Sequence, residues 1–299
     1  MTYAKLPGLT WDGTVYENEE MGTLEALLPT GGWPTAHAPA MVELPNGDLL
    51  CCWFAGTYEG SADVHIICSV LPHDGTKWLE PVNISGDPTR SEQNPSLFYG
   101  PDNAVWAMYT AQLDRVEGKD NMQFTAVVRC QKSTDGGKTW SDERVVMTPT
   151  PHSMDWFSVC DPAVFKYGDY YYIGYTSTIF ADAGGVCNNG FVARSASPTG
   201  PFEKWNGNGW GETRETANGT LHWIGKPAPV IYYDEDWHDW GAGEFSFVVK
   251  DTTLYIYYTW SSRKADGSLY SETRVATADV TDPNWPGHLT YHGTAAVRN

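Results

Sequence analysis

Two acidic residues, Asp161 and Glu244, stand at matching places in a pattern that recurs four times along the chain. Hydrolysis of a glycosidic bond with inversion needs two carboxyl groups about 6.5–9.5 Å apart, one protonated and one ionised. The sequence therefore predicts that these two carboxyl groups act together on a sugar. Aromatic neighbours such as Trp156 and Trp240 would disfavour the charged form of Glu244 by desolvation, which suits a general acid. The alternative is that both residues accept structural hydrogen bonds at strand ends.

Other polar and aromatic residues stand near the same places in the pattern. His37 could shuttle a proton, bind a substrate oxygen or hold an ion, or it could be a satisfied structural histidine. The amides of Gln93 and Asn94 can bond sugar hydroxyls. Glu59 and Asp63 follow the second predicted strand of the first copy and could reach the same rim. Candidate stacking platforms, which could equally be core residues, are Trp33, Trp156, Trp237 and Trp240.

The recurring pattern is a polar residue, a Pro or its replacement, a small residue and an apolar run. Its copies begin at His37-Ala38-Pro39, Gln93-Asn94-Pro95, Cys160-Asp161-Pro162 and Gly243-Glu244-Phe245, and each copy closes on a Trp, namely Trp78, Trp140, Trp205 or Trp285. Repeats of this length built from short strands are typical of an all-β fold, the β-propeller. Because the innermost strands of a propeller start beside its axis, we expect the residues just ahead of each Pro position to converge.

The repeats predict four blades at about residues 36–85, 94–148, 160–210 and 243–295. Residues 1–33 are an N-terminal extension, in which the apolar stretch 24–28 could add a closing outer strand to the last blade, and residues 34–299 are the propeller. The stretch from 210 to 240 fits no blade. Four repeats allow a four-bladed ring, an irregular five-bladed ring, or an incomplete propeller that closes by self-association.

Composition excludes some partners and cofactors. The net charge is −18 with only 19 basic residues, which excludes a nucleic-acid partner, and no apolar run is long enough to cross a membrane. No signal peptide is evident, so we expect a cytoplasmic protein, or a secreted one recorded without its leader. None of the six Cys forms a C-x-x-C pair, which predicts neither disulfides nor a zinc site. No cofactor is expected beyond a lone channel calcium ion, held where oxygen ligands converge.

A specific motif lies in the second repeat. Residues 133–140 read Ser-Thr-Asp-Gly-Gly-Lys-Thr-Trp and match the Asp-box, S-x-D-x-G-x-T-W. Its Asp135 is expected to be structural, accepting N–H bonds within a hairpin turn. With this box, and with His37-Ala38-Pro39, Phe54-Ala55-Gly56 and Gln93-Asn94-Pro95, residues 33–148 resemble the BNR-repeat sialidase-like family.

True sialidases have an Arg shortly before the first-blade Pro, where it binds the substrate carboxylate. This chain has no Arg there, which argues against cleavage of sialic acid. Some relatives with His at this point look like uronic-acid-handling enzymes, including rhamnose–glucuronate lyases. That resemblance implies a proton-transfer role for His37.

Residues 155–299 resemble a different group, the family 43 glycoside hydrolases and related five-bladed propellers. The resemblance is carried by Asp161-Pro162-Ala163, by the run 194–202 with its Ser-Pro-Thr-Gly-Pro-Phe, and by Gly243-Glu244-Phe245. Those enzymes use an Asp base, an Asp that tunes pKa and a Glu acid. By blade order these positions hold Asn94, Asp161 and Glu244, and since Asn cannot act as a base this mapping predicts a crippled hydrolase. Counting the third blade first instead makes Asp161 the base.

Three functions follow from these residues and resemblances. The first is an exo-acting glycoside hydrolase with Glu244 as acid and Asp161 as base or tuning group. The second is a uronic-acid lyase that uses His37. The third is a non-catalytic glycan-binding propeller, or an engineered chimera, because the resemblance changes near residue 150. Each implies an oligosaccharide or glycoside as the partner.

Overall fold

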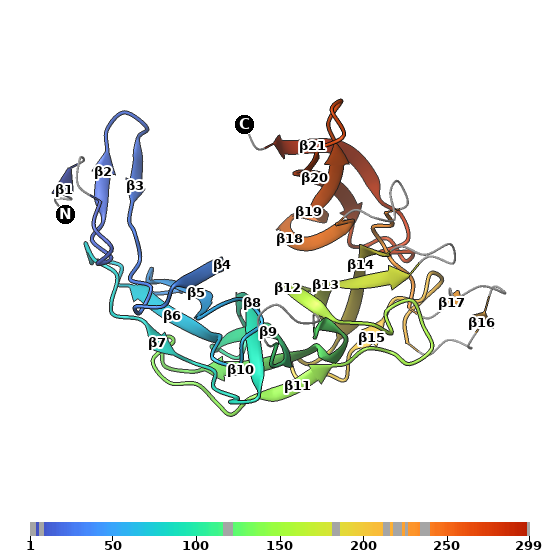
Figure 1. Ribbon diagram of the computed structural model, residues 1–299, viewed down its shortest axis with the longest axis horizontal. Coiled ribbons are helices and arrows are strands. Elements are labelled where there is room, and N and C mark those ends of the chain that lie inside the picture. Colours follow the sequence, from blue (N-terminus) through green and yellow to red (C-terminus); the bar gives the residue numbers. More distant parts are fainter. Residues whose placement is uncertain are drawn as a thin grey trace. The chain divides into compact units, whose positions relative to one another are not determined.

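The computed structural model of the chain describes residues 4–5, 9–115, 122–180, 186–211, 216–217, 223–224, 227–233 and 240–297. Its architecture is a β-propeller with four blades, as the sequence predicts, and each blade is a four-stranded sheet whose strands pair in chain order (Figure 1). The chain divides into two compact units, which are described separately below. The first comprises Met1–Ala107, Ala111–Met122 and Gln131–Glu143, and the second comprises Met108–Thr110, Gln123–Cys130 and Arg144–Asn299.

The first two blades lie close to their predicted ranges. Blade one consists of β4 (Thr35–Glu43), β5 (Leu49–Gly56), β6 (His65–Leu71) and β7 (Val82–Asn83). Blade two consists of β8 (Arg90–Tyr99), β9 (Val105–Leu113), β10 (Val127–Ser133) and β11 (Arg144–Met147), with a short 3-10 helix, η1 (Gln123–Thr125), ahead of β10. A 3-10 turn therefore precedes the third strand of this blade.

Blades three and four belong to the second unit. Blade three consists of β12 (Cys160–Tyr167), β13 (Tyr170–Phe180), β14 (Val186–Ser195) and β15 (Glu203–Lys204). Blade four consists of β18 (Ala242–Lys250), β19 (Thr253–Arg263), β20 (Leu269–Asp279) and β21 (Thr290–Val297). Between them, in the stretch that fits no blade, β16 (Thr216–Ala217) pairs with β17 (Trp223–Ile224).

The N-terminal extension has a sheet of its own. In it β1 (Ala4–Lys5) pairs with β2 (Tyr16–Asn18), and β2 pairs with β3 (Thr23–Glu25). The fourth strand of blade four is β21. The closing role suggested for residues 24–28 stays a prediction.

The first strand of every blade contains one residue in the left-handed backbone region. These residues are Ala38 (φ 55°), Asn94 (φ 51°), Asp161 (φ 54°) and Glu244 (φ 52°). In β4, β12 and β18 the strand pairing shifts at this residue, which marks a β-bulge. The next residue is Pro in three of the blades, and Pro fits a bulge because it has no N–H to lose from the ladder. The repeat aligned from the sequence is therefore a repeat of backbone conformation.

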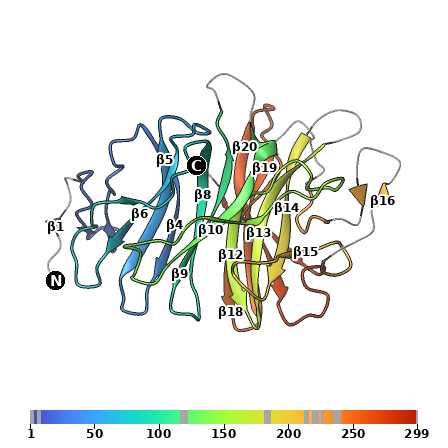
Figure 2. The same cartoon turned by 90° about the horizontal axis from the view of Figure 1, so that it is seen from below.

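The first strand of one blade packs across the face of the blade before it. In the second unit, β18 contacts β12, β13 and β14 of blade three, and Figure 2 shows these strands side by side. The rings of Phe245 and Phe247 lie where side chains at Gly174 and Gly190 would otherwise be, so the two glycines admit the rings. Phe247 also lies 4.8 Å, ring centre to ring centre, from Phe165. This aromatic layer is the main core between blades three and four.

The absence of disulfides expected from the sequence is wrong for one pair, since Cys52 and Cys68 are joined by a disulfide. The two residues lie directly opposite each other on β5 and β6, a pairing that the spacing of the cysteines could not reveal. Cys51, Cys130, Cys160 and Cys187 are buried and take no part in a disulfide among the described residues. Burial raises the pKa of the Cys51 thiol to about 11, so it remains protonated near neutral pH.

Reduction of this disulfide should destabilise the chain. The cysteines are 16 residues apart, and closing a loop of roughly 15 residues removes denatured-state entropy equivalent to about 3 kcal/mol. Urea unfolding with and without reductant measures the loss. A double variant, Cys52→Ala with Cys68→Ala, is the control, and its stability should not respond to reductant. An equal response from both proteins would contradict the assignment.

The Asp-box turn holds its aspartate by local hydrogen bonds. The carboxylate of Asp135 accepts bonds from the hydroxyl of Thr139 at 2.6 Å, from the N–H of Thr139 at 2.9 Å and from the N–H of Lys138 at 3.1 Å. The Thr139 hydroxyl is the largest influence, and together these bonds outweigh burial and lower the pKa of Asp135 to about 2. Its contribution is therefore to the turn rather than to a site.

That lowered pKa predicts a pH dependence of stability. A carboxyl group whose pKa is lower in the folded state stabilises the fold above its unfolded value of 3.8, and this contribution is lost as pH falls through about 2. Between pH 5 and pH 2 the unfolding free energy of Asp135→Asn should therefore fall less steeply than that of the wild type. Urea midpoints across this range test the difference, with Asp142→Asn as a nearby exposed control. Parallel curves for wild type and Asp135→Asn would refute the prediction.

In the part of the chain that the structure describes, no helix has the length and apolar character needed to cross a bilayer.

Candidate active site

Asp161 and Glu244 occupy equivalent positions on consecutive blades of the second unit. The N–H of Asp161 donates to Thr110 Oγ1 of the preceding blade at 2.9 Å, and the N–H of Glu244 donates to Thr176 Oγ1 at the same distance. Each carboxyl-bearing residue is thus fixed by its left-handed backbone and by a threonine of the blade before it. Both lie at the end of their blade where the first strand begins.

Glu244 is held but open to solvent. Its Oε2 accepts a hydrogen bond of 2.7 Å from Thr259 Oγ1, on the next strand of the same blade. Thr259 lies opposite Gly243, as Thr176 lies opposite Cys160 in blade three. The threonines at this position were missed in the sequence analysis, although aligning the second strands of the repeats would have revealed their recurrence.

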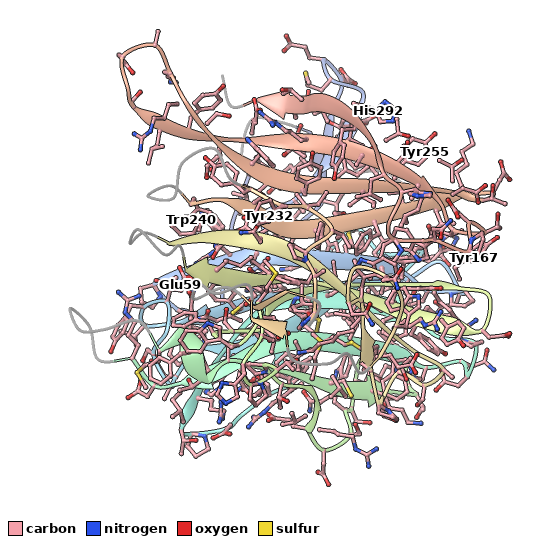
Figure 3. All side chains as sticks on the ribbon, turned by 90° about the vertical axis from the view of Figure 1, so that its right-hand side faces the viewer. Glu59, Tyr167, Tyr232, Trp240, Tyr255 and His292 are labelled. Atoms are coloured by element: carbon pink, nitrogen blue, oxygen red, sulfur yellow. A yellow bond between two sulfur atoms is a disulfide. The ribbon has the colours of Figure 1, made fainter. Side chains whose placement is uncertain are left out.

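Trp240 lies at the same end of blade four as Glu244. Figure 3 shows Trp240 near the beginning of β18, whereas Tyr255 and Tyr167 lie at the opposite end of the second unit. The indole of Trp240 is 63% exposed, and Glu244 is exposed as well. The prediction that aromatic packing encloses Glu244 is therefore wrong.

Asp161 is half-buried and follows a loop with an exposed aromatic surface. Trp156 is exposed and meets Phe157 edge-on, with ring centres 5.7 Å apart. Phe157 in turn lies 6.3 Å from the exposed ring of Phe124. Of the predicted stacking platforms, Trp156 and Trp240 are thus available to a ligand.

A buried polar network fixes the loop that leads to Asp161. Asp155 is fully buried, forms an ion pair with Lys204, and accepts a 3.0 Å hydrogen bond from the Tyr175 hydroxyl. The ammonium of Lys204 also donates to the Thr148 carbonyl oxygen at 2.6 Å. Burial lowers the pKa of Lys204, and the Asp155 carboxylate opposes that shift. Nothing in the sequence pattern distinguishes Asp155 from other loop aspartates, so the network could not be predicted.

In the first unit, His37 pairs with Glu59. Nε2 of His37 lies 3.7 Å from Oε2 of Glu59, and both side chains are about half exposed. The imidazole also packs on Phe54, with ring centres 4.0 Å apart. His37 stands one residue before the left-handed position, which in blade one is Ala38 and has no functional side chain.

Most of the remaining predicted residues of the first unit are at least partly buried or form hydrogen bonds within the fold. Gln93 is buried, and its Nε2 donates to Ser91 Oγ at 2.8 Å. Asn94 is half-buried at the left-handed position of blade two. Trp33 packs against the core of blade one. Burial would raise the pKa of Asp63, but hydrogen bonds including those from Thr57 outweigh it and lower that pKa.

Two further predictions concern Trp237 as a stacking platform and a bound calcium ion. Trp237 lies outside the described residues, as do His238 and Asp239. Among the residues that are described, no three His, Cys, Asp or Glu side chains are grouped so as to hold a metal ion.

Comparison with known proteins agrees with the β-propeller fold. Residues 47–169 match the family model of the BNR repeat-like domain. No curated protein matches the chain in sequence.

Three solved structures illustrate the likeness. A thermostable family-43 glycoside hydrolase is 16% identical, with a TM-score of 0.59 over 93% of this chain and 83% of its own. The xylan β-1,4-xylosidase from Bacillus halodurans is 15% identical, with a TM-score of 0.55 over 97% of this chain and 45% of its own. A Hadza microbial sialidase is 13% identical, with a TM-score of 0.56 over 91% of this chain and 48% of its own. The chain thus spans less than half the length of the xylosidase and the sialidase.

Proposed function

We propose that this chain is a carbohydrate-active enzyme, an exo-acting glycoside hydrolase in which Glu244 and Asp161 are the reacting carboxyl groups. The observation that carries the proposal is their equivalence: both lie at the left-handed bulge of consecutive first strands, each anchored to a threonine of the preceding blade. The family-43 glycoside hydrolase and the xylan β-1,4-xylosidase, whose folds resemble this one, support the same reaction class.

In this proposal Glu244 is the general acid. Protonated, it donates a proton to the glycosidic oxygen as the bond to the sugar breaks, while a water molecule attacks the opposite face of the ring. The hydroxyl of Thr259 fixes the direction of the Glu244 carboxyl group and acts as a positioning residue.

Asp161 has one of two roles in the proposal. As the base, Asp161 would remove a proton from the attacking water. As a tuning group, it would only alter how readily neighbouring groups gain or lose a proton. The exposed indoles of Trp156 and Trp240 are the proposed platforms for the apolar face of the sugar.

The test is hydrolysis of aryl glycosides, beginning with xylosides and arabinofuranosides and including a sialoside. Activity should appear on a neutral pentoside and not on the sialoside, because no Arg precedes the first-blade Pro. Proton NMR of the fresh product should show inversion at the anomeric carbon. Asp161→Asn should lower kcat at least 100-fold if Asp161 is the base. Substrate binding with no turnover by the wild type would favour a glycan-binding propeller instead.

The pairing of His37 with Glu59 supports a second candidate, a uronic-acid lyase. An imidazole beside a carboxylate can take a proton from the carbon next to a uronate carboxyl group. The bond from the adjacent carbon to the glycosidic oxygen then breaks, this oxygen leaves and takes up a proton, and the carbon–carbon double bond that forms absorbs in the ultraviolet. Rising absorbance on uronate oligosaccharides, abolished by His37→Ala, would favour the lyase, and a flat trace would exclude it.

The disulfide bears on localisation. Disulfides persist mainly in oxidising compartments, so the bond between Cys52 and Cys68 supports the secreted alternative over the cytoplasmic one.

A further inference from the structure

The same blade-to-blade contact occurs in both units of the chain. In the first unit β8 packs across β4, β5 and β6, and in the second unit β18 packs across β12, β13 and β14. Each contact joins a leading face, formed by the first strand of one blade, to a trailing face on the sheet of the blade before it. The equivalent residues of different blades can therefore be compared directly.

Blade one has an uncovered leading face, which consists of Pro39 and Met41. In the other blades, the residues equivalent to Pro39 are buried, and those equivalent to Met41 are buried or half-buried. They are Pro95, Pro162 and Phe245 for the first position and Leu97, Val164 and Phe247 for the second. Pro39 is exposed, and Met41 is 61% exposed. The apolar surface that is covered in each of the other blades is thus exposed in blade one.

Blade four has an uncovered trailing face, which consists of Val248, Tyr255, Tyr257 and Thr259. Strand pairing aligns Val248 and Tyr255 with Phe165 and Tyr172 of blade three. Phe165 and Tyr172 are buried beneath β18, whereas Val248 is 52% exposed and Tyr255 is half-exposed.

Thr259 on the trailing face of blade four is equivalent to a threonine that forms a hydrogen bond between blades elsewhere in the chain. It stands where Thr110 and Thr176 stand in the preceding blades, and each of those hydroxyls accepts an N–H from the left-handed residue of the next blade. Ala38 is the left-handed residue of blade one. The Ala38 N–H and the Thr259 hydroxyl are thus the two halves of a contact that two other blade junctions make.

We propose that the trailing face of blade four binds the leading face of blade one of a second copy of this chain. A second copy fits this face because the two open faces are the complementary sides of the blade-to-blade interface. The contact is head-to-tail, so two copies close a ring if the rotation permits. Two four-bladed chains supply eight blades, within the four to eight that propellers use.

The first experiment measures molecular mass in solution by sedimentation and light scattering, from about 1 to 100 μM, a range that spans micromolar dissociation constants. The wild type should reach at least twice the 33.1-kDa chain mass. Met41→Glu and Val248→Glu should each lower the association constant at least tenfold, because each buries an unpaired charge in the contact. The matched controls are Met21→Glu and Val145→Glu, at residues 69% and 48% exposed, and neither should change the mass.

A mixing experiment tests the head-to-tail geometry. The Met41→Glu protein keeps an intact trailing face, and the Val248→Glu protein keeps an intact leading face. Mixed in equal amounts, the two variants should form a one-to-one pair although each alone is monomeric. Recovery of the pair also shows that both variants remain folded.

Three results would overturn the proposal. A wild type that stays monomeric throughout the range excludes binding of a second copy. If β18 and β19 of that monomer are nevertheless protected from hydrogen exchange, the chain's own β4 covers them instead. Dimers sensitive to Val248→Glu but not to Met41→Glu indicate a symmetric contact. Variants that stay monomeric when mixed show that the two faces do not bind each other.

Discussion

Glu244→Gln is expected to lower kcat at least 100-fold on glycosides with poor leaving groups, because the amide cannot donate the proton that the departing oxygen needs. KM should change little, since the variant keeps the shape of the side chain. The Gln oxygen can still accept the hydrogen bond from Thr259, so folding should be unaffected. Steady-state kinetics on the substrate identified by the glycoside panel make the measurement.

The leaving group distinguishes an acid from a merely structural residue. On an activated dinitrophenyl glycoside, whose leaving group needs no protonation, the loss caused by Glu244→Gln should shrink markedly. Glu43→Gln, at an exposed glutamate on the first strand of blade one, is the matched control and should retain full activity. A loss below tenfold on the poor leaving group would remove Glu244 from the acid role.

Lys204→Met should cost about 3–5 kcal/mol of unfolding free energy, the expected effect of leaving a buried charge without its partner. The carboxylate of Asp155 is fully buried, and Lys204 is its ion-pair partner. Because Asp155 anchors the loop that carries Trp156 and leads into Asp161, glycosidase activity should fall as well. Urea unfolding followed by tryptophan fluorescence measures the stability.

Two further variants isolate the ion pair. Adding Asp155→Asn to Lys204→Met removes the uncompensated charge, so the double variant should lose less stability than the sum of the two single losses. Lys166→Met, at an exposed lysine of β12, should change stability by less than about 0.5 kcal/mol. Strictly additive losses in the double variant would show that Lys204 and Asp155 do not stabilise each other.

Much of the fold was predictable because it repeats. The apolar run after each Pro position, the hairpin turns and the closing Trp residues are local features, and four copies of them define four blades. The equivalence of Asn94, Asp161 and Glu244 was also visible, and the structure assigns these residues the same left-handed conformation.

The predictions of the site were less complete. In blade one the left-handed position holds Ala38, so His37 stands one residue before the place that Asn94, Asp161 and Glu244 occupy in the other blades. The sequence could not indicate that Gln93 is buried or that Trp33 belongs to a core, because Gln and Trp occur both in ligand-binding sites and in protein interiors. Exposure of Glu244 is likewise a property of packing, which the local sequence does not specify.

The amino-acid sequence determined the propeller, its blade boundaries and the alignment of Asp161 with Glu244, because a repeat of short strands and turns is encoded within each copy. Only the tertiary structure revealed the disulfide between Cys52 and Cys68, the burial of Asp155 against Lys204, and the threonines that hold the two carboxyl-bearing residues. Each of these depends on contacts between different strands or blades. Residues far apart in the chain meet there through the register and packing of whole sheets, which no local pattern specifies.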